Sequence, residues 1–131
     1  MSDGLVDAAR DAMTRAYAPY SGYRVGAALR ARDGSVITGC NVENASYPAG
    51  ICAERVALSA AVAQGHREFD AIAICVDAVT PASPCGICRQ VLAEFAPQLV
   101  ITSATTRGAR REWTLDALLP VPFTSEVLRD A

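Results

Sequence analysis

The sequence has no lysine and a single histidine, so its positive charge comes almost entirely from twelve arginines. Fourteen acidic residues outweigh them and leave a formal net charge of -2. A molecule of this charge does not attract a nucleic-acid backbone or an anionic membrane surface. A protein that coats a duplex or a membrane is therefore disfavoured.

Long apolar runs and targeting signals are also missing. Runs such as Ala71 to Val76 fall far short of the roughly 18 residues of a membrane span. Residues 1–4 do not begin a basic region followed by an apolar one, which argues against a signal peptide. We therefore expect a cytoplasmic protein. Because domains commonly contain about 100 to 150 residues, we also expect a single domain that covers residues 1–131.

Apolar residues and cysteines, in contrast, are plentiful. Apolar side chains make up 51% of the chain. This is slightly more than the roughly 45 to 50% of ordinary soluble domains and suggests self-association. Five cysteines in a reducing cytosol suit metal binding or redox chemistry better than a disulfide framework. The shortage of histidine leaves thiolates as the main candidate metal ligands.

Alternating helical and strand patterns indicate an α/β fold in which helices cover a mixed sheet. Apolar residues at three- and four-residue steps predict an amphipathic helix from Leu5 to Tyr17. Asp33 and Gly34 can supply the positive φ angles of a tight hairpin turn. The remaining patterns predict strands over 25–31, 35–39, 71–76, 98–102 and 110–114, and helices over 52–63, 85–95, 114–120 and 124–128.

Two cysteine motifs lie at the starts of predicted helices. One is Cys52-Ala53-Glu54, and the other is Pro-Cys-Gly-Ile-Cys at residues 84–88. The first turn of a helix carries unpaired N–H groups and a partial positive charge, which lower the pKa of a thiol. Cys85 and Cys88 are one turn apart, so both sulfurs face the same side and can share one ion.

Together with Cys52, this pair would give a zinc ion three protein ligands and leave its fourth position free for water. Zinc lowers the pKa of such a water from 15.7 to about 7, and Glu54 is well placed to shuttle protons to and from it. Three thiolates leave the site anionic, so a cation should hydrogen-bond to the sulfurs. Arg55 or Arg89 could serve, and we favour Arg55 because it adjoins Glu54.

Other interpretations of the same residues remain open. A Cys-x-x-Cys pair is also typical of thioredoxin-like redox proteins. Cys40 could be a fourth ligand and close a purely structural zinc site, although Cys40 and Cys75 are otherwise best explained as small buried residues. Glu54 and Arg55 could be ordinary charges in a first helical turn.

These motifs resemble a known family. Cys-x-Glu followed by Pro-Cys-x-x-Cys is the signature of zinc-dependent nucleobase deaminases. The likeness to the small homotetrameric cytidine deaminases covers nearly the whole chain. It is carried by residues 18–21 (APYS), 25–29 (VGAAL), 39–48 (GCNVENASYP), 52–55 (CAER), 84–90 (PCGICRQ), 118–120 (LLP) and Phe123. The resemblance implies a three-layer α/β/α sandwich with a mixed five-stranded sheet, forming one catalytic domain.

The resemblance also implies an activity, the hydrolytic deamination of cytidine and 2'-deoxycytidine to the uridines with release of ammonia, as in pyrimidine salvage. One zinc ion per chain would be held by Cys52, Cys85 and Cys88. Glu54 would take a proton from the zinc-bound water and deliver it to N3 of the ring and then to the leaving amine.

The substrate-binding residues are likewise implied by the resemblance. Asn41 and Glu43 match residues that bind the ribose hydroxyls, and the backbone of Ala53 lies near the ring carbonyl. Ala45, Tyr47 and Phe123 match positions that a neighbouring subunit contributes in the homotetramer. Taken without the resemblance, Asn41 could form an Asx turn, Glu43 could be a solvated loop charge and Phe123 could be a core residue.

One position departs from the family pattern. Tyr23 stands where phenylalanine is usual, and Arg24 follows where proline is common. The Tyr23 ring can still stack on a pyrimidine, but its hydroxyl needs a partner or water. This difference leaves room for an altered substrate preference.

Two other deaminase functions fit less well. A deaminase of a blasticidin-type nucleoside antibiotic is disfavoured because Asn41 and Glu43 argue for a ribose. A deaminase that acts within nucleic acid is disfavoured because the sequence shows no basic or aromatic strand-binding channel.

Overall fold

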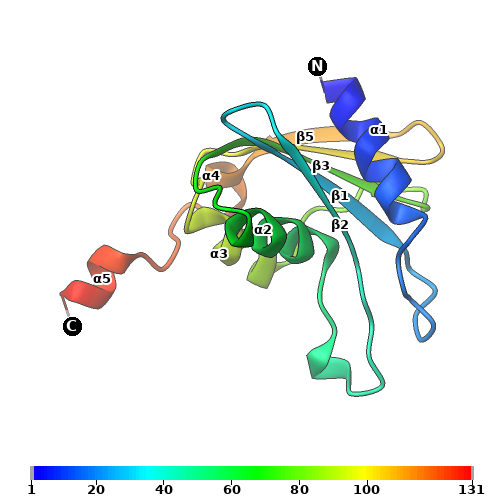
Figure 1. Cartoon of the computed structure of the whole chain (residues 1–131), viewed down its shortest axis with the longest axis horizontal. Coiled ribbons are helices and arrows are strands. Elements are labelled where there is room, and N and C mark those ends of the chain that lie inside the picture. The colour runs from blue at the N-terminus through cyan, green and yellow to red at the C-terminus, as the bar shows by residue number, and fades with distance from the viewer. Residues whose placement is uncertain (1, 131) are drawn as a thin grey trace.

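A five-stranded mixed sheet organises the fold of the computed structural model, which describes residues 2–130 (Figure 1). Its strands lie in the order β2-β1-β3-β4-β5. They are β1 (Val25–Ala31), β2 (Val36–Cys40), β3 (Phe69–Val76), β4 (Val100–Thr105) and β5 (Arg110–Thr114). β3 and β4 run parallel, and the other neighbouring pairs are antiparallel.

Helices cover both faces of this sheet. Helix α1 (Ser2–Met13) lies on one face, and α2 (Ala53–Ala63) and α3 (Gly86–Ala93) lie on the other (Figure 1). The short α4 (Leu115–Leu118) follows β5, and α5 (Ser125–Arg129) extends away from the sheet at the C-terminal end. The expected three-layer α/β/α sandwich is confirmed. No helix in residues 2–130 is both long and apolar enough to cross a bilayer.

The central strand β3 supplies side chains to both layers of the core. Ile72 and Ile74 belong to the larger apolar cluster beneath α2 and α3, whereas Ala73 and Cys75 face the smaller cluster beneath α1. All four side chains are almost completely buried, as the apolar run in the sequence predicted. Cys75 is thus a packing residue of the core.

Strands β1 and β2 come so close to the helices that each needs a residue without a side chain at one position. A Cβ atom on Gly26 of β1 would lie 1.9 Å from the carbonyl oxygen of Ala9 in α1. A Cβ atom on Gly39 of β2 would lie 2.5 Å from the backbone nitrogen of Ala57 in α2. Gly39 therefore sets the distance between the sheet and the helix that carries the first cysteine motif.

The first helix ends earlier than the sequence pattern predicts, at Met13 and not at Tyr17. The hydroxyl of Thr14 donates to the carbonyl of Asp11 at 2.6 Å, and the backbone turns tightly over the following residues. The amide of Tyr17 then donates to the carbonyl of Asn41 at 3.0 Å. Residues 14–17 therefore leave the helix and pair with this distant segment, although the local apolar periodicity continues to Tyr17.

The hairpin between β1 and β2 forms, but its turn differs from the prediction. Gly34 has a φ of 93°, and among the described residues positive φ angles occur at glycines alone. Asp33 instead accepts a hydrogen bond on Oδ1 from the backbone nitrogen of Ser35 at 2.9 Å. The turn therefore needs one left-handed residue instead of two, because a longer loop closes the hairpin.

Strand boundaries also differ from the predicted ones, because pairing with neighbouring strands sets them. β3 begins at Phe69, before the predicted start, and β4 covers 100–105 instead of 98–102. Antiparallel pairing of Phe69 with Ala31 of β1 sets the start of β3. The parallel ladder from Ala71 opposite Val100 to Val76 opposite Thr105 sets the limits of β4. A strand end of this kind depends on its partner and is not visible in local sequence.

We expect the Gly39→Ala substitution to destabilise the protein by about 1 to 3 kcal/mol, because the added methyl group overpacks the contact between β2 and α2. Urea unfolding would measure the loss. The Gly4→Ala substitution is the matched control, since a Cβ atom there meets nothing within 4 Å. Equal stability of the two variants would contradict the proposed close approach.

Candidate active site

The two cysteine motifs meet where helices α2 and α3 begin. Cys52 is the N-cap residue of α2, and Cys85 is the N-cap residue of α3. Their sulfur atoms lie 3.9 Å apart. Cys88, one turn into α3, is buried beneath them, and the three sulfurs all lie within 4.8 Å of one another. Cys40 is not part of this cluster.

The spacing of the three sulfurs fits a metal ion. Ligands at a zinc–sulfur distance of about 2.3 Å around a tetrahedral ion lie about 3.8 Å apart, close to the separation of Cys52 and Cys85. Hydrogen bonding from Cys88 lowers the pKa of Cys52 to about 5, whereas the same interaction and burial raise the pKa of Cys88. Between these two residues Cys52 is therefore the one that ionises first, and deprotonation of Cys88 beside it calls for a cation among the sulfurs.

Arg55 and Arg89 have different partners. The Nη2 atom of Arg55 lies 3.7 Å from the sulfur of Cys52. Arg89 instead donates from Nε to the carbonyl of Pro84 at 2.7 Å and from Nη1 to the carbonyl of Leu118 at 3.0 Å. The cation beside the thiols is therefore Arg55, while Arg89 fastens the loop before α3 to α4.

Glu54 lies in the first turn of α2 with a side chain that is 6% exposed. Burial raises its pKa to about 7, and the negative charge of Cys52 adds to the effect. A carboxyl group poised near neutral pH can both accept and donate a proton, which is the property that a general acid–base residue requires.

A cavity of about 320 Å³ opens over this group, within the range of about 300 to 1,000 Å³ of small-molecule sites. Many of the residues that the sequence singled out line it. They are Tyr23, Asn41, Glu43, Cys52, Ala53, Glu54 and Cys85. Segments far apart in the chain thus form one concave surface around the buried carboxyl group.

Two of these residues also hold the neighbouring loop. The Nδ2 atom of Asn41 donates to the carbonyl of Tyr23 at 2.8 Å, and its Oδ1 atom accepts from the amide of Val25 at 2.8 Å. Glu43 accepts on Oε1 from the amides of Tyr20 at 3.0 Å and Ser21 at 3.1 Å. Hydrogen bonding from Ser21 lowers the pKa of Glu43. Asn41 therefore forms no Asx turn, and Glu43 is not a free loop charge.

The remaining candidate residues do not line this cavity. Ala45 is exposed, Tyr47 is 75% exposed and Phe123 is 58% exposed. Tyr47 makes an edge-to-face contact with Tyr20, with 5.9 Å between ring centroids. Phe123 is therefore not a core residue, and both aromatic rings offer apolar surface to the outside of the chain.

Gln90 has a contact that sequence reasoning did not assign. Its side-chain amide donates from Nε2 to the carbonyl of Phe123 at 2.8 Å and accepts on Oε1 from the amide of Phe123 at 3.0 Å. The signal available in the sequence was its place at the end of the motif at residues 84–90. Two hydrogen bonds thus fix the backbone of Phe123 to α3, the helix that carries Cys88.

Comparison with known proteins agrees with this site. Residues 2–104 match the family model described as the cytidine and deoxycytidylate deaminase zinc-binding region. The chain is 46% identical to a cytidine deaminase of Halalkalibacterium halodurans over 127 residues, covering 96% of each sequence. It is 44% identical to a cytidine deaminase of Sporosarcina psychrophila, covering 95% of this chain and 92% of the relative.

A solved structure gives the same result. The crystal structure of cytidine deaminase from Burkholderia pseudomallei matches with a TM-score of 0.90 and 46% identity, covering 94% of this chain and 99% of that one. Family match, relatives and fold agree with a cavity that places three thiols beside a buried carboxyl group. The chain belongs to the zinc-binding cytidine and deoxycytidylate deaminase family.

Proposed function

We propose that residues 1–131 form one catalytic domain that deaminates cytidine and 2'-deoxycytidine to uridine and 2'-deoxyuridine, with release of ammonia, in cytoplasmic pyrimidine salvage. The observation that carries the proposal is the buried carboxyl group of Glu54 in the same cavity as the cysteine cluster. The names of the most similar relatives support the same substrate.

Cys52, Cys85 and Cys88 would hold one zinc ion, and Arg55 would offset the charge on the sulfur of Cys52. When bound, zinc supplies Lewis acidity, which makes water nucleophilic at neutral pH. The N-termini of α2 and α3 support the thiolates, because their partial positive charge lies beside the two N-cap cysteines.

Glu54 would move the protons of the reaction. Hydrolysis adds water across the C4–N3 bond of the ring and then expels the amino group as ammonia. The carboxylate accepts one proton as the oxygen of water bonds to C4, and the resulting carboxylic acid delivers that proton to N3. The carboxylate then takes the proton of the new C4 hydroxyl group and passes it to the amino nitrogen, so that ammonia leaves as the C4 carbonyl forms. Burial keeps bulk water from competing for this proton.

The rest of the cavity would bind the nucleoside. Asn41 and Glu43 would hydrogen-bond the ribose, the backbone of Ala53 would meet the ring carbonyl, and the Tyr23 ring would pack on the base. Asn41 retains a second amide hydrogen and a second lone pair beyond its two loop contacts. Loop anchoring and ribose binding are therefore compatible at this residue.

The active form would be a homotetramer whose sites combine residues from several chains. Residues that complete the site of a neighbouring subunit must lie outside the chain's own cavity and expose apolar surface. This is true of Ala45, Tyr47 and Phe123. The high apolar fraction of the sequence points the same way. Gln90 would present Phe123 by fixing its backbone.

The alternative functions explain less of this arrangement. A thiol redox pair needs two sulfurs and gives no role to the third sulfur or to buried Glu54. A closed structural zinc site would need a fourth ligand, and Cys40 lies outside the described cluster. Zinc-dependent catalysis gives a role to all three sulfurs and to the buried carboxyl group of Glu54.

We expect the Glu54→Gln variant to lose at least about 10²- to 10⁴-fold in kcat on cytidine, because an amide cannot transfer the protons. Loss of the cytosine absorbance measures the rate, and metal analysis should still find one zinc per chain. Glu68→Gln, which removes a surface charge opposite Arg32, is the control and should keep full activity. Full activity of Glu54→Gln would refute the assigned role.

The Arg55→Ala variant should bind zinc about 10- to 100-fold more weakly, because Cys52 loses its cationic neighbour. Competition with a chromogenic chelator measures the affinity without reference to activity. Arg32→Ala, which removes an arginine from a surface ion pair, should retain the original affinity. Equal zinc binding by both variants would exclude the role of Arg55.

Shared sites can be tested by mixing subunits. Glu54→Gln and Phe123→Ala should each have low activity alone, but co-expression should restore part of it because hybrids contain sites with both intact residues. Co-expression of Glu54→Gln with Cys52→Ala should restore none, since those residues serve the same cavity. Light scattering should give a particle of about four chains of 13.8 kDa. A fully active monomer would contradict the proposal.

A further inference from the structure

The segment between α1 and β1 brings Tyr23 to the wall of the cavity, but the protein core does not hold it there. The Tyr23 side chain is 45% exposed. Gly22, the preceding residue, has a φ of 70° and open space around it. A glycine in this conformation is a point of backbone freedom, so the position of Tyr23 depends on contacts made by the segment itself.

Side chains, and not a sheet ladder, make several of these contacts. The amide of Tyr23 donates to the hydroxyl of Ser21 at 3.0 Å, and that hydroxyl donates to the carboxylate of Glu43. The carbonyl of Tyr23 accepts from Asn41 at 2.8 Å. On this side, the bonds attach the segment to residues 41–43, the stretch of chain that follows β2.

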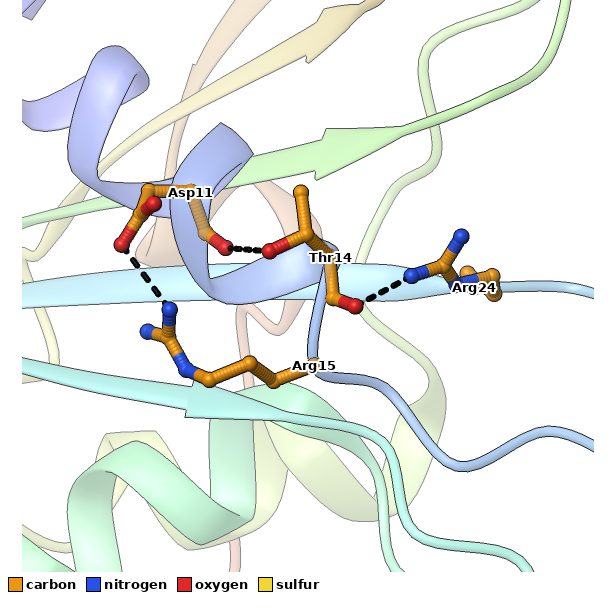
Figure 2. Close-up of polar contacts among 4 residues, drawn as sticks. All are labelled: Asp11, Thr14, Arg15 and Arg24. Carbon is orange, nitrogen blue, oxygen red and sulfur yellow. Dashed lines mark hydrogen bonds and ion pairs between the residues drawn. The ribbon is translucent and has the colours of Figure 1, made fainter.

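Arg24 attaches the segment on the other side. Figure 2 shows its guanidinium donating through Nη2 to the carbonyl of Thr14, just beyond the last residue of α1. Carbonyl groups at the end of a helix lack intrahelical partners and carry a partial negative charge, so a cationic donor is favoured there. The contact joins the turn just after helix α1 to the residue that follows Tyr23.

We propose that Arg24 is a positioning residue that ties the Tyr23 segment to the end of α1 and so holds the aromatic ring in the cavity wall. The proposal rests on the function proposed above in one respect, that Tyr23 packs on the base of the substrate. Arg24 itself is exposed and does not line the cavity. Its effect must therefore pass through Tyr23.

Arg15 provides a matched control at the same helix end. Its Nη1 atom donates to Oδ2 of Asp11 at 3.0 Å, within the helix and its first following residues (Figure 2). Arg15→Ala and Arg24→Ala remove the same charge from the same region. Arg24→Ala alone releases the segment that carries Tyr23, and Arg24→Lys keeps a cationic donor.

We expect Arg24→Ala to raise KM for cytidine about threefold to tenfold with little change in kcat, the range that corresponds to loss of one net hydrogen bond. Arg24→Lys should recover part of the loss, and Arg15→Ala should match the unmodified protein. In a Tyr23→Ala background, Arg24→Ala should have no further effect on KM. An undiminished effect in that background, or equal KM values for Arg24→Ala and Arg15→Ala, would overturn the proposal.

Hydrogen exchange tests whether the contact between Arg24 and Thr14 holds the Tyr23 segment, without any assay of catalysis. The amide of Tyr23 should exchange about threefold to tenfold faster in Arg24→Ala than in Arg15→Ala. Faster exchange in Arg24→Ala, with no turnover of cytidine by the unmodified protein, would support the contact between Arg24 and Thr14 and reject the proposed function. Equal exchange in the two variants would reject the tie, whatever the substrate.

Discussion

Three sulfur atoms held within 4.8 Å of one another impose the main constraint on this protein. Ionising all three would concentrate negative charge in a small volume, and that charge has to be balanced. A metal ion, the positive ends of two helices and the guanidinium of Arg55 can all contribute. The N-termini of α2 and α3 must therefore lie side by side. The sheet on which the two helices pack sets their positions.

The sheet meets this requirement through close packing on one side and strand pairing on the other. Gly39 lets α2 lie against β2 with backbone atoms nearly in contact. The parallel pair β3 and β4 places the chain that leads to α3 at the end of a buried strand. The same geometry buries Glu54 beside Cys52, so one packing arrangement sets both the charge of the cluster and the pKa of the carboxyl group.

The opposite wall of the cavity is built differently. It consists of a loop whose backbone is bonded to the side chains of Asn41, Ser21 and Glu43 and to α1 through Arg24. Polar side chains can hold a loop in a defined place while leaving it exposed, which a substrate cavity needs. The exposed rings of Tyr47 and Phe123 complete no part of this chain's own cavity, which is the observation behind the proposal that sites are shared between chains.

The sequence by itself determined the α/β class, most of the helices and strands, and the likeness of the cysteine motifs to a deaminase. Local chemistry suffices there, because apolar periodicity, an N-cap cysteine and a Cys-x-x-Cys turn are properties of neighbouring residues. Tertiary structure decided where α1 stops, which arginine meets the thiols and that Asn41 and Gln90 hold distant backbone. These outcomes depend on which groups meet across the fold, and hydrogen-bonding groups far apart in sequence leave no local pattern.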